Sequence, residues 1–371
     1  MPSFAKKIRS VLINYKQAPA MIRRRCSANL SYRFSNLVSH QASPPETINF
    51  YPTDRCNLKC SMCFERLRKP RSEMKISDWQ KIINQMKKFQ PRIHLSGGEP
   101  FLYPDIIELI SYIKARNFFL VITTNGTFLN KYANDIVASG VNRIHISIDG
   151  PEKIHDRIRG VPGTFKRIME GLKKIKKLCK NSRLPIIRIN SMINLTDPAA
   201  MQEVIKIACN INAASIQFQH PFFVNCQNLI SHRLFLQKNL GLDLNYWQSA
   251  DIDCDKPKDF AGAMNVIRDL RAEKSIPVKV FPELSAPQLQ AYYGAANDFY
   301  EIYPGECRAM WNTATILPSG YVESCPDYVI GNCKQSPFLT LWNNNKMKEL
   351  RQRIRRRQFF TVCRGCCFFY D

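Results

Sequence analysis

Long apolar runs are what this sequence lacks most clearly. No stretch approaches the ~18 consecutive apolar residues that a transmembrane helix needs. The first residues also lack the apolar segment and cleavage site of a secretory signal. With 45% hydrophobic and 23% charged residues, the 371-residue chain has the composition of a globular protein. We therefore predict a cytoplasmic protein.

Acidic residues are scarce. The chain has 54 Lys and Arg against 30 Asp and Glu, a formal net charge of +24. Residues 1–45 carry eight Lys or Arg and no acid, while Phe4, Ile8, Val11 and Leu12 would share one face of a helix. This basic N-terminal arm is interpreted either as a membrane-surface helix, which would place the protein peripherally at the membrane, or as a solvated arm packed on the rest of the chain.

A second basic run, from Arg351 to Arg357, holds five arginines in a helical pattern. This pattern favours a solvated helix face over a position beside an anionic substrate. The net charge alone would also suit a nucleic-acid-modifying protein. No nucleic-acid-binding motif accompanies it, so there is no strong evidence for such a partner.

Cysteine, in contrast, is abundant, with fourteen in the chain. A disulfide framework of that density suits short secreted chains, whereas clustered cysteines in a longer chain favour metal thiolates in a reducing compartment. The first cluster is Cys56, Cys60 and Cys63, with the spacing C-x3-C-x2-C. Three thiolates can hold three irons of a [4Fe–4S] cluster and leave the fourth iron open. A structural zinc site would need a fourth ligand, and the next residue is Phe64.

Three further motifs follow these cysteines. They are Ser96-Gly97-Gly98-Glu99-Pro100, Thr123-Thr124-Asn125-Gly126 and Ser147-Ile148-Asp149-Gly150. In this order the four motifs resemble those of the radical S-adenosylmethionine (radical SAM) enzymes, over about residues 46–225. In that family the open iron chelates the amino and carboxylate groups of SAM. Reductive cleavage then gives a 5′-deoxyadenosyl radical, which abstracts a hydrogen atom from the substrate.

The resemblance implies cofactor-binding roles for residues at several strand ends. It places Gly97, Gly98 and Glu99 at the SAM amino group, and Asn125, Ser147 and Asp149 around the adenosine. Ordinary turn and strand-end capping are the alternatives for these residues. Arg188, ranked ahead of Arg159, is the candidate partner of the SAM carboxylate, because a guanidinium binds carboxylates bidentately.

The pattern of elements predicts an α/β fold. Apolar, β-branched runs alternate with helical patterns, including Ser77–Phe89, with Ser77 as N-cap, and Thr164–Cys179. Each chemical motif follows a strand, as a site at the carboxyl ends of parallel strands requires. Six such units match the partial (β/α)6 barrel of the radical SAM core. The predicted strands are Thr47–Tyr51, Ile93–Ser96, Phe119–Thr123, Arg143–Ile148, Ile186–Ile193 and Ser215–Gln219.

A second cysteine constellation lies near the C-terminus, around a predicted hairpin of Thr313–Leu317 and Tyr321–Glu323. It resembles the Twitch domain, the shortened relative of the SPASM domain, and implies one auxiliary [4Fe–4S] cluster. A structural zinc site is the alternative. Cys367 is an alternative ligand to Cys366, and Cys333 is interpreted as a small buried apolar residue. The predicted ligands are Cys307, Cys325, Cys363 and Cys366.

Four segments follow from these patterns. They are a basic N-terminal arm (1–45), a radical SAM core (46–225), a helical connecting region (226–300) and a Twitch/SPASM-like domain (301–371). The connecting region shows a helical pattern at Asp259–Lys274 and a short strand at Val278–Phe281. The isolated cysteines are interpreted as buried structural thiols; they are Cys26, Cys179, Cys209, Cys226 and Cys254.

The predicted activity is that of a radical SAM oxidoreductase. A cluster with four cysteine ligands has no open iron, which favours electron transfer and a net oxidation. Asp327 is a candidate general base, with a solvated loop carboxylate as the alternative. The expected partners are a small-molecule, lipid or peptide substrate and an electron donor such as a flavodoxin or ferredoxin. A peptide-modifying maturase and a non-catalytic iron–sulfur carrier or scaffold are the alternative functions.

Overall fold

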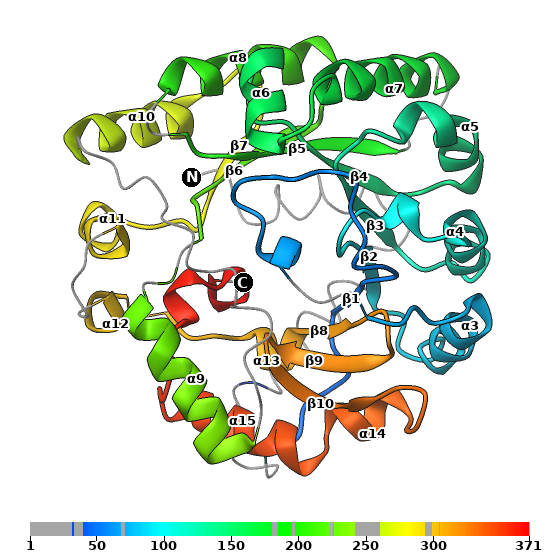
Figure 1. Ribbon diagram of the computed structural model, residues 1–371, viewed down its shortest axis with the longest axis vertical. Coiled ribbons are helices and arrows are strands. Elements are labelled where there is room, and N and C mark those ends of the chain that lie inside the picture. Colours follow the sequence, from blue (N-terminus) through cyan, green and yellow to red (C-terminus); the bar gives the residue numbers. More distant parts are fainter. Residues whose placement is uncertain are drawn as a thin grey trace, which may run out of the picture.

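Figure 1 shows the computed structural model of the chain. It describes residues 32, 40–67, 71–179, 185–194, 197–222, 224, 226–241, 260–293, 299–303 and 305–370. The predicted helix and the arginines of the N-terminal arm therefore lie outside the described residues. In the part of the chain that is described, no helix combines the length and the apolar character that a membrane crossing requires.

Seven parallel strands form the centre of the molecule, in the order β1 to β7. All six predicted strands of the core are present, each within two residues of its predicted ends, and the predicted strand in the connecting region is β7. The strands are β1 (Thr47–Phe50), β2 (Arg92–Leu95), β3 (Leu120–Thr124), β4 (Arg143–Ser147), β5 (Ile186–Met192), β6 (Ser215–Gln219) and β7 (Val278–Phe281).

The C-terminal strands continue this same sheet. The first of them, β8 (Thr313–Ile316), pairs in parallel with β1, and β9 (Tyr321–Cys325) and β10 (Tyr328–Asn332) follow as antiparallel neighbours. The predicted hairpin is therefore confirmed, but it does not stand apart. It extends a ten-stranded sheet whose edges are β10 and β7.

Helices connect the strands and lie outside them, so that the sheet curves around as a partial barrel (Figure 1). Those of the core are α3 (Ile76–Gln85), α4 (Ile106–Lys114), α5 (Leu129–Ser139), α6 (Glu152–Arg159), α7 (Thr164–Leu178) and α8 (Pro198–Asn210). Four short 3₁₀ turns are also present: η1 (Phe64–Leu67), η2 (Pro100–Leu102), η4 (Cys363–Gly365) and η5 (Cys367–Tyr370).

Seven further helices lie between β6 and η4. They are α9 (Cys226–Leu240), α10 (Phe260–Ala272), α11 (Ala286–Tyr293), α12 (Phe299–Ile302), α13 (Ala309–Asn312), α14 (Phe338–Trp342) and α15 (Asn345–Arg355). One predicted detail is wrong: Ser77 is not an N-cap. Helix α3 begins one residue earlier, with Lys75 in the cap position and no side-chain cap bond, so Ser77 lies in the first turn.

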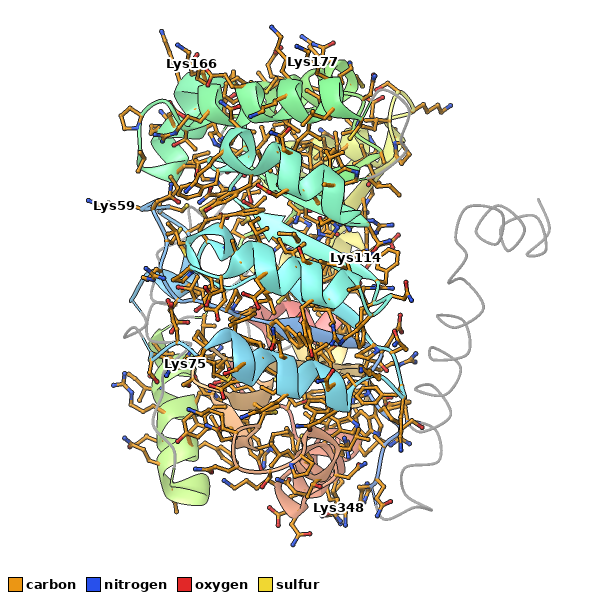
Figure 2. All side chains as sticks on the ribbon, turned by 90° about the vertical axis from the view of Figure 1, so that its right-hand side faces the viewer. Lys59, Lys75, Lys114, Lys166, Lys177 and Lys348 are labelled. Atoms are coloured by element: carbon orange, nitrogen blue, oxygen red, sulfur yellow. The ribbon has the colours of Figure 1, made fainter. Side chains whose placement is uncertain are left out.

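The core lies between the strands and these helices. Alternate residues of β4 and β6 point outward and are fully buried, among them Ile144, Ile146 and Ile216, while the residues between them are half-buried. This is the period of two that a strand imposes on its side chains. Lysines before α3, on α7 and on α15 project from different parts of the surface, so the positive charge is spread widely (Figure 2).

Candidate active site

The first three cysteines lie in the loop that follows β1, at the carboxyl ends of the strands. In Figure 1 this loop and η1 lie over the middle of the ring of strands. Cys56 is exposed, Cys60 is buried and Cys63 is intermediate. The three residues therefore differ in exposure, and burial still raises the pKa of the Cys56 thiol.

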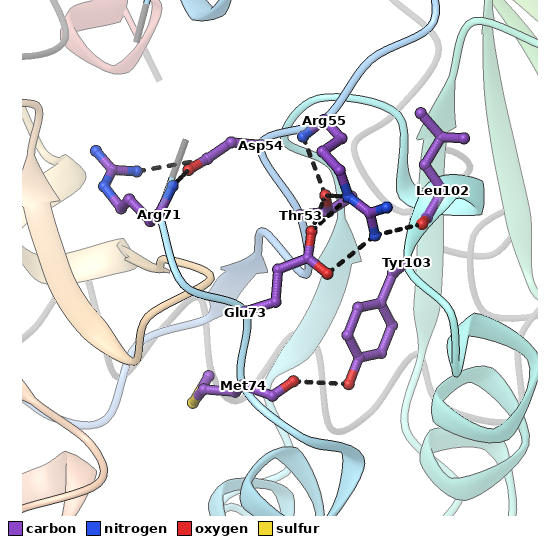
Figure 3. A network of polar contacts seen from close by, with 8 residues as sticks. All are labelled: Thr53, Asp54, Arg55, Arg71, Glu73, Met74, Leu102 and Tyr103. Carbon is purple, nitrogen blue, oxygen red and sulfur yellow. Dashed lines mark hydrogen bonds and ion pairs between the residues drawn. The ribbon is translucent and has the colours of Figure 1, made fainter. Parts of the chain in front are cut away.

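A polar network closes the base of this loop (Figure 3). Arg55 donates to both carboxylate oxygens of Glu73, at 2.8 and 3.0 Å, and Thr53 donates to the same carboxylate. The backbone N–H of Arg71 donates to Asp54 at 3.1 Å. These contacts join residues before the cysteines to residues after η1, so they hold the two ends of the loop together.

The tip of the loop rests on the C-terminal end of α6. The N–H groups of Lys59 and Ser61 donate to the carbonyl oxygens of Arg159 and Ile158, each at 3.1 Å. The last carbonyls of a helix have no partner within the helix, so the loop satisfies them. Gly160 ends α6 in the left-handed region, and a Cβ there would lie 2.6 Å from the Lys59 carbonyl oxygen. Only glycine fits this approach.

Arg159 connects the cysteine loop to the end of β4. One guanidinium nitrogen lies 3.7 Å from Sγ of Cys60, and another lies 2.7 Å from Oδ2 of Asp149. Asp149 also accepts from the N–H of Met192 at 2.9 Å, and its own N–H donates to Nδ1 of His155 at 3.2 Å. Burial lowers the pKa of His155 to about 4, so the imidazole is neutral and accepts this bond.

The Gly-Gly-Glu segment packs directly on the backbone before the cysteines. A Cβ on Gly98 would lie 2.3 Å from the carbonyl oxygen of Arg55, so a side chain there would displace the loop. The buried Glu99 accepts from the hydroxyl of Thr124 and the N–H of Asn125, both at 2.8 Å. Burial raises the pKa of Glu99 to about 7, although its hydrogen bonds favour the charged form. The segment thus positions the loop and the end of β3.

Asn125 joins the third motif to the cysteines. Its amide nitrogen lies 2.9 Å from Oδ1 of Asn57 and 3.9 Å from Sγ of Cys56. The Asn57 amide also donates to the hydroxyl of Thr127 at 3.0 Å. The structure therefore brings together Glu99, Asn125 and Asp149 around the cysteine loop.

Ser147 and Arg188 lie on the inner face of the strands. Ser147 is the last residue of β4 and pairs with Asn190. Arg188 pairs with His145, two positions before the strand end. It is thus deeper in the barrel than the other predicted cofactor-binding residues, and Arg159, ranked second from the sequence, is the arginine that contacts the loop.

The C-terminal cysteines form a second, more enclosed group. Cys307, Cys363 and Cys366 are buried, and Cys325 is intermediate. Burial and the charges of Cys363 and Cys307 raise the pKa of Cys325 well above the usual thiol value. A hydrogen bond with Cys367 and burial do the same for the pKa of Cys366. The four predicted ligands therefore lie close enough to interact electrically.

Aromatic side chains surround this group. Tyr300 accepts from the N–H of Arg364 at 2.9 Å, and Tyr370 donates to the Arg364 carbonyl at 2.7 Å, so both hold the turn between Cys363 and Cys366. Burial lifts the pKa of Tyr300 far above its ordinary value. The aromatic rings therefore bury Cys363 and Cys366, while Cys325 remains partly accessible.

Both groups offer thiols as their donor atoms. Thiolates are the normal ligands of a [4Fe–4S] cluster, which spreads them over several irons. The loop cysteines and the C-terminal four thus fit the clusters that the sequence implies.

The remaining cysteines differ from these sets. Burial alone raises the pKa of Cys333 to about 12, with no contribution from another thiol, as its apolar interpretation predicts. Cys179 and Cys209 are half-buried, not buried as predicted. Cys26, Cys254 and the side chain of Cys226 lie outside the described residues.

Two polar residues near the C-terminus differ from their sequence interpretation. Asp327 is buried, not solvated, and occupies the left-handed position (φ 67°) of the turn between β9 and β10. Arg351 is fully buried, not part of a solvated face. It donates to the carbonyl oxygens of Met310, His40 and Trp342 and to the side chain of Asn343. Burial lowers its pKa to about 9.

Some residues of the site were missed from the sequence. Asn57 and Thr127 give no pattern, because their importance depends on the packing of one loop on another. His155 was missed too, although its position six residues after Asp149 places it on the first turns of α6. The sequence did offer a signal for His155: it is a polar residue on the buried face of α6, the helix that follows the motif containing Asp149.

Comparison with known proteins agrees with this architecture. The family model of the radical SAM superfamily matches residues 50–198, and that of the SPASM iron–sulfur cluster-binding domain matches residues 307–367. The fold is similar to that of SuiB from Streptococcus suis bound to S-adenosylmethionine, with a TM-score of 0.64 and 18% identity. That match covers 91% of this chain and 76% of SuiB.

Two relatives are similar over most of the chain. An AdoMet-dependent heme synthase from Methanosarcina barkeri is 23% identical, over 87% of this chain and 91% of the relative. A PqqA peptide cyclase from Gluconobacter oxydans is 24% identical, over 67% of this chain and 75% of the relative. The two domain models imply a SAM-binding [4Fe–4S] cluster, SAM and an auxiliary iron–sulfur site. This chain therefore belongs to the radical SAM superfamily and carries a C-terminal SPASM domain.

Proposed function

We propose that this protein is a radical SAM oxidoreductase, in which Cys56, Cys60 and Cys63 hold the cluster that binds SAM. The observation that carries the proposal is the convergence of four motifs at one site. The cysteine loop packs on Gly98 and on α6, while Asn125 and Arg159 reach two of its three sulfurs. When bound, the cluster and SAM supply a 5′-deoxyadenosyl radical for hydrogen abstraction.

The residues around the loop have positioning roles in this proposal. Glu99 holds the ends of η2 and β3, and Asp149 holds Arg159 and the end of β5. Arg159 is the better placed partner for the SAM carboxylate, because it lies beside Cys60. Arg188, first in rank from the sequence, lies deeper in the barrel, opposite His145, so Arg159 takes its place in this proposal. Gly97, Ser147 and Asn125 would line the rest of the cofactor site.

The C-terminal thiols would hold the auxiliary cluster, with Cys307, Cys325, Cys363 and Cys366 as ligands. Four cysteines leave no open iron, which supports an electron-transfer role and a net oxidation of the substrate. Asp327 would accept a substrate proton in such an oxidation, and its position two residues after Cys325 motivates this assignment. An electron donor such as a flavodoxin or ferredoxin would supply the reducing electron for SAM cleavage.

The substrate is proposed as a small molecule, a lipid or a peptide. The heme synthase among the relatives supports a small molecule, while the PqqA peptide cyclase supports the second candidate function, a peptide-modifying maturase. A peripheral membrane contact through the N-terminal arm remains part of the proposal, on the charge of residues 1–45.

The test is made on protein purified and reconstituted without oxygen. We expect about eight irons per chain, two clusters of four, and 5′-deoxyadenosine after addition of dithionite and SAM. The triple variant Cys56→Ala, Cys60→Ala, Cys63→Ala should keep about four irons and form no 5′-deoxyadenosine. A cluster-replete wild type that never cleaves SAM, with or without candidate substrates, would contradict the proposal and favour an iron–sulfur carrier.

A further inference from the structure

The inner face of the barrel is less completely buried than its outer face. On β4 and β5 the outward residues Ile146 and Ile189 are fully buried beneath the helices, whereas His145 and Arg188 retain partial exposure. The same alternation continues on β6. The helices of the core cover the outside of the strands (Figure 1), so the alternation places these half-buried residues on the opposite, inner face of the sheet.

On strands β1 to β7 the charge of this inner face has one sign, and farther along the same sheet the buried Glu323 of β9, which pairs with Thr315, adds one acid to it. Cross-strand partners point to the same side of a sheet, so the strand register shows which charged residues lie on the inner face. The strands β1 to β7 contribute Arg92, Arg143, Arg188 and Lys279 to it, and no acid. Arg92 lies 3.4 Å from Glu46, and Lys279 lies over the ring of Phe281.

Arg188 differs from these cations. Among the described residues no hydrogen bond or ion pair is found for it, and its side chain is half-buried. Burial and the charge of Arg143 lower its pKa to about 10, so the guanidinium still carries its charge at neutral pH. A cation that is half-removed from water without a partner loses part of its hydration, and an anionic partner would compensate for this loss.

A neutral histidine layer lies beside Arg188. His94 contacts Oδ1 of Asn49 at 3.2 Å and the hydroxyl of Thr123 at 2.7 Å, so both of its ring nitrogens are occupied. Its neighbour His145, whose ring centroid is 5.9 Å away, pairs directly with Arg188 across β4 and β5. Nε2 of His145 is buried and has no hydrogen-bond partner among the described residues.

We propose that Arg188, together with the imidazole of His145, binds one anionic group of the substrate, a carboxylate or a phosphate, inside the barrel. The planar guanidinium offers two parallel donors that match either group, and the neutral imidazole offers a third. The position is deeper than the cysteine loop, so a substrate anchored there reaches toward the cofactor from the opposite side. This inference rests on the proposed function, because it names a substrate class for the same site.

The anchor selects substrates by charge. A neutral molecule in the barrel leaves the guanidinium unpaired, whereas a site built for a polar group discriminates strongly against ligands that lack it. If Arg188 were absent, an anion at this position would have only the neutral rings of His94 and His145 beside it, and no cation to balance its charge. Arg188 is therefore expected to determine specificity without taking part in the cleavage of SAM.

The first experiment measures anion binding to the reconstituted, SAM-loaded protein. Thermal unfolding is followed in inorganic phosphate, pyrophosphate, succinate and citrate, each against potassium chloride at the same ionic strength. We expect saturable stabilisation by at least one of these anions, and a loss of apparent affinity of tenfold or more in Arg188→Met. Arg157→Met is the matched control, because it removes one exposed charge from α6 and should bind the anion like the wild type.

The same variant separates an anchor from a structural arginine. Without added anion, Arg188→Met should unfold at the same temperature as the wild type or higher, because it removes a half-buried charge that has no partner among the described residues. Arg188→Lys should recover part of the anion effect. A fall of several degrees in Arg188→Met, or equal anion stabilisation of the wild type and Arg188→Met, would overturn the proposal.

Formation of 5′-deoxyadenosine without substrate distinguishes this inference from the proposed function. Arg188→Met should bind SAM and cleave it within about threefold of the wild type. Loss of SAM binding in this variant would assign Arg188 to the SAM carboxylate and overturn the anion site. If the wild type cleaves SAM but no anion stabilises it, the inference fails alone. If Arg188-dependent anion binding is present and SAM is never cleaved, the proposed function fails and the anion site stands.

Discussion

The two cysteine groups are built in opposite ways. The loop after β1 is fixed by backbone contacts to its neighbours, at Lys59, Ser61 and Gly98, while Cys56 stays exposed. The C-terminal thiols instead lie among tyrosine and phenylalanine side chains. Burial there raises the pKa of Cys325 and of Tyr300, so it disfavours their charged forms. The difference matches what metal sites require. A site that exchanges ligands keeps an open position, and a closed site needs a protected ligand set.

The strongest test of this contrast removes the closed site alone. Cys325→Ala with Cys363→Ala should abolish product formation, because the auxiliary cluster loses two ligands, yet leave 5′-deoxyadenosine formation within about threefold of wild type. Cys333→Ala is the matched control, a buried thiol outside the set. Loss of SAM cleavage in the double variant, measured by chromatography, would mean that the two groups do not act separately.

Arg351 tests how far the closed region depends on one buried cation. Arg351→Met leaves three carbonyl oxygens without their donor, and we expect a loss of about 3–5 kcal/mol in the free energy of unfolding. Denaturant unfolding measures this loss, and the exposed Arg356→Met on the same segment should change stability by less than about 0.5 kcal/mol. Similar stabilities for both variants would show that the pairing around Arg351 contributes little.

His220 lies between the two regions, at the end of β6, and contacts the hydroxyl of Tyr293 at 2.6 Å. Burial, aided by the charge of Arg271, lowers its pKa to about 3 from the ordinary 6.5. The folded state therefore binds fewer protons than the unfolded chain between these values, and stability falls as the pH drops below 6.5. At pH 5 this costs about 2 kcal/mol.

The measurement compares unfolding of the wild type and His220→Gln at pH 7.5 and pH 5. The glutamine variant should lose about 2 kcal/mol less over this interval, because it has no proton to take up. His40, whose pKa is also lowered, lies outside both cysteine groups and gives a second site for comparison through His40→Gln. An equal pH dependence in wild type and His220→Gln would contradict the assignment.

The smallest effect is expected at the base of the open loop. Glu73→Gln removes an ion pair to the half-exposed Arg55, so it should cost about 1 kcal/mol or less. If the loop depends mainly on its backbone contacts, iron content and SAM cleavage stay near wild type. A large loss of iron in this variant, measured by colorimetric assay, would show that side-chain contacts, and not backbone contacts, hold the loop.

The parts predicted from the sequence are those that local patterns encode. The strands of the core follow from β-branched runs, and the cysteine spacing identifies the loop. Long-range packing was invisible: Arg351 looked like one of five solvated arginines, but its partner His40 is 311 residues away. Asp327 was predicted to be solvated because the two-residue turn that it forms with Pro326 has the sequence of a surface loop. The surroundings of Arg188 likewise depend on the residues that the neighbouring strands β4 and β6 place beside it.

The pairing of β8 with β1 also has a consequence for how the chain is made. Strand β1 forms at residues 47–50, and its outer neighbour at residues 313–316. During synthesis, the edge of β1 therefore stays open until most of the chain has left the ribosome, and an open edge invites pairing with other chains. The C-terminal strands β8 to β10 therefore cover the edge of β1 late in synthesis, although β10 is itself an edge of the finished sheet. Truncations that remove these strands are expected to aggregate, even though all residues of the cysteine loop are retained.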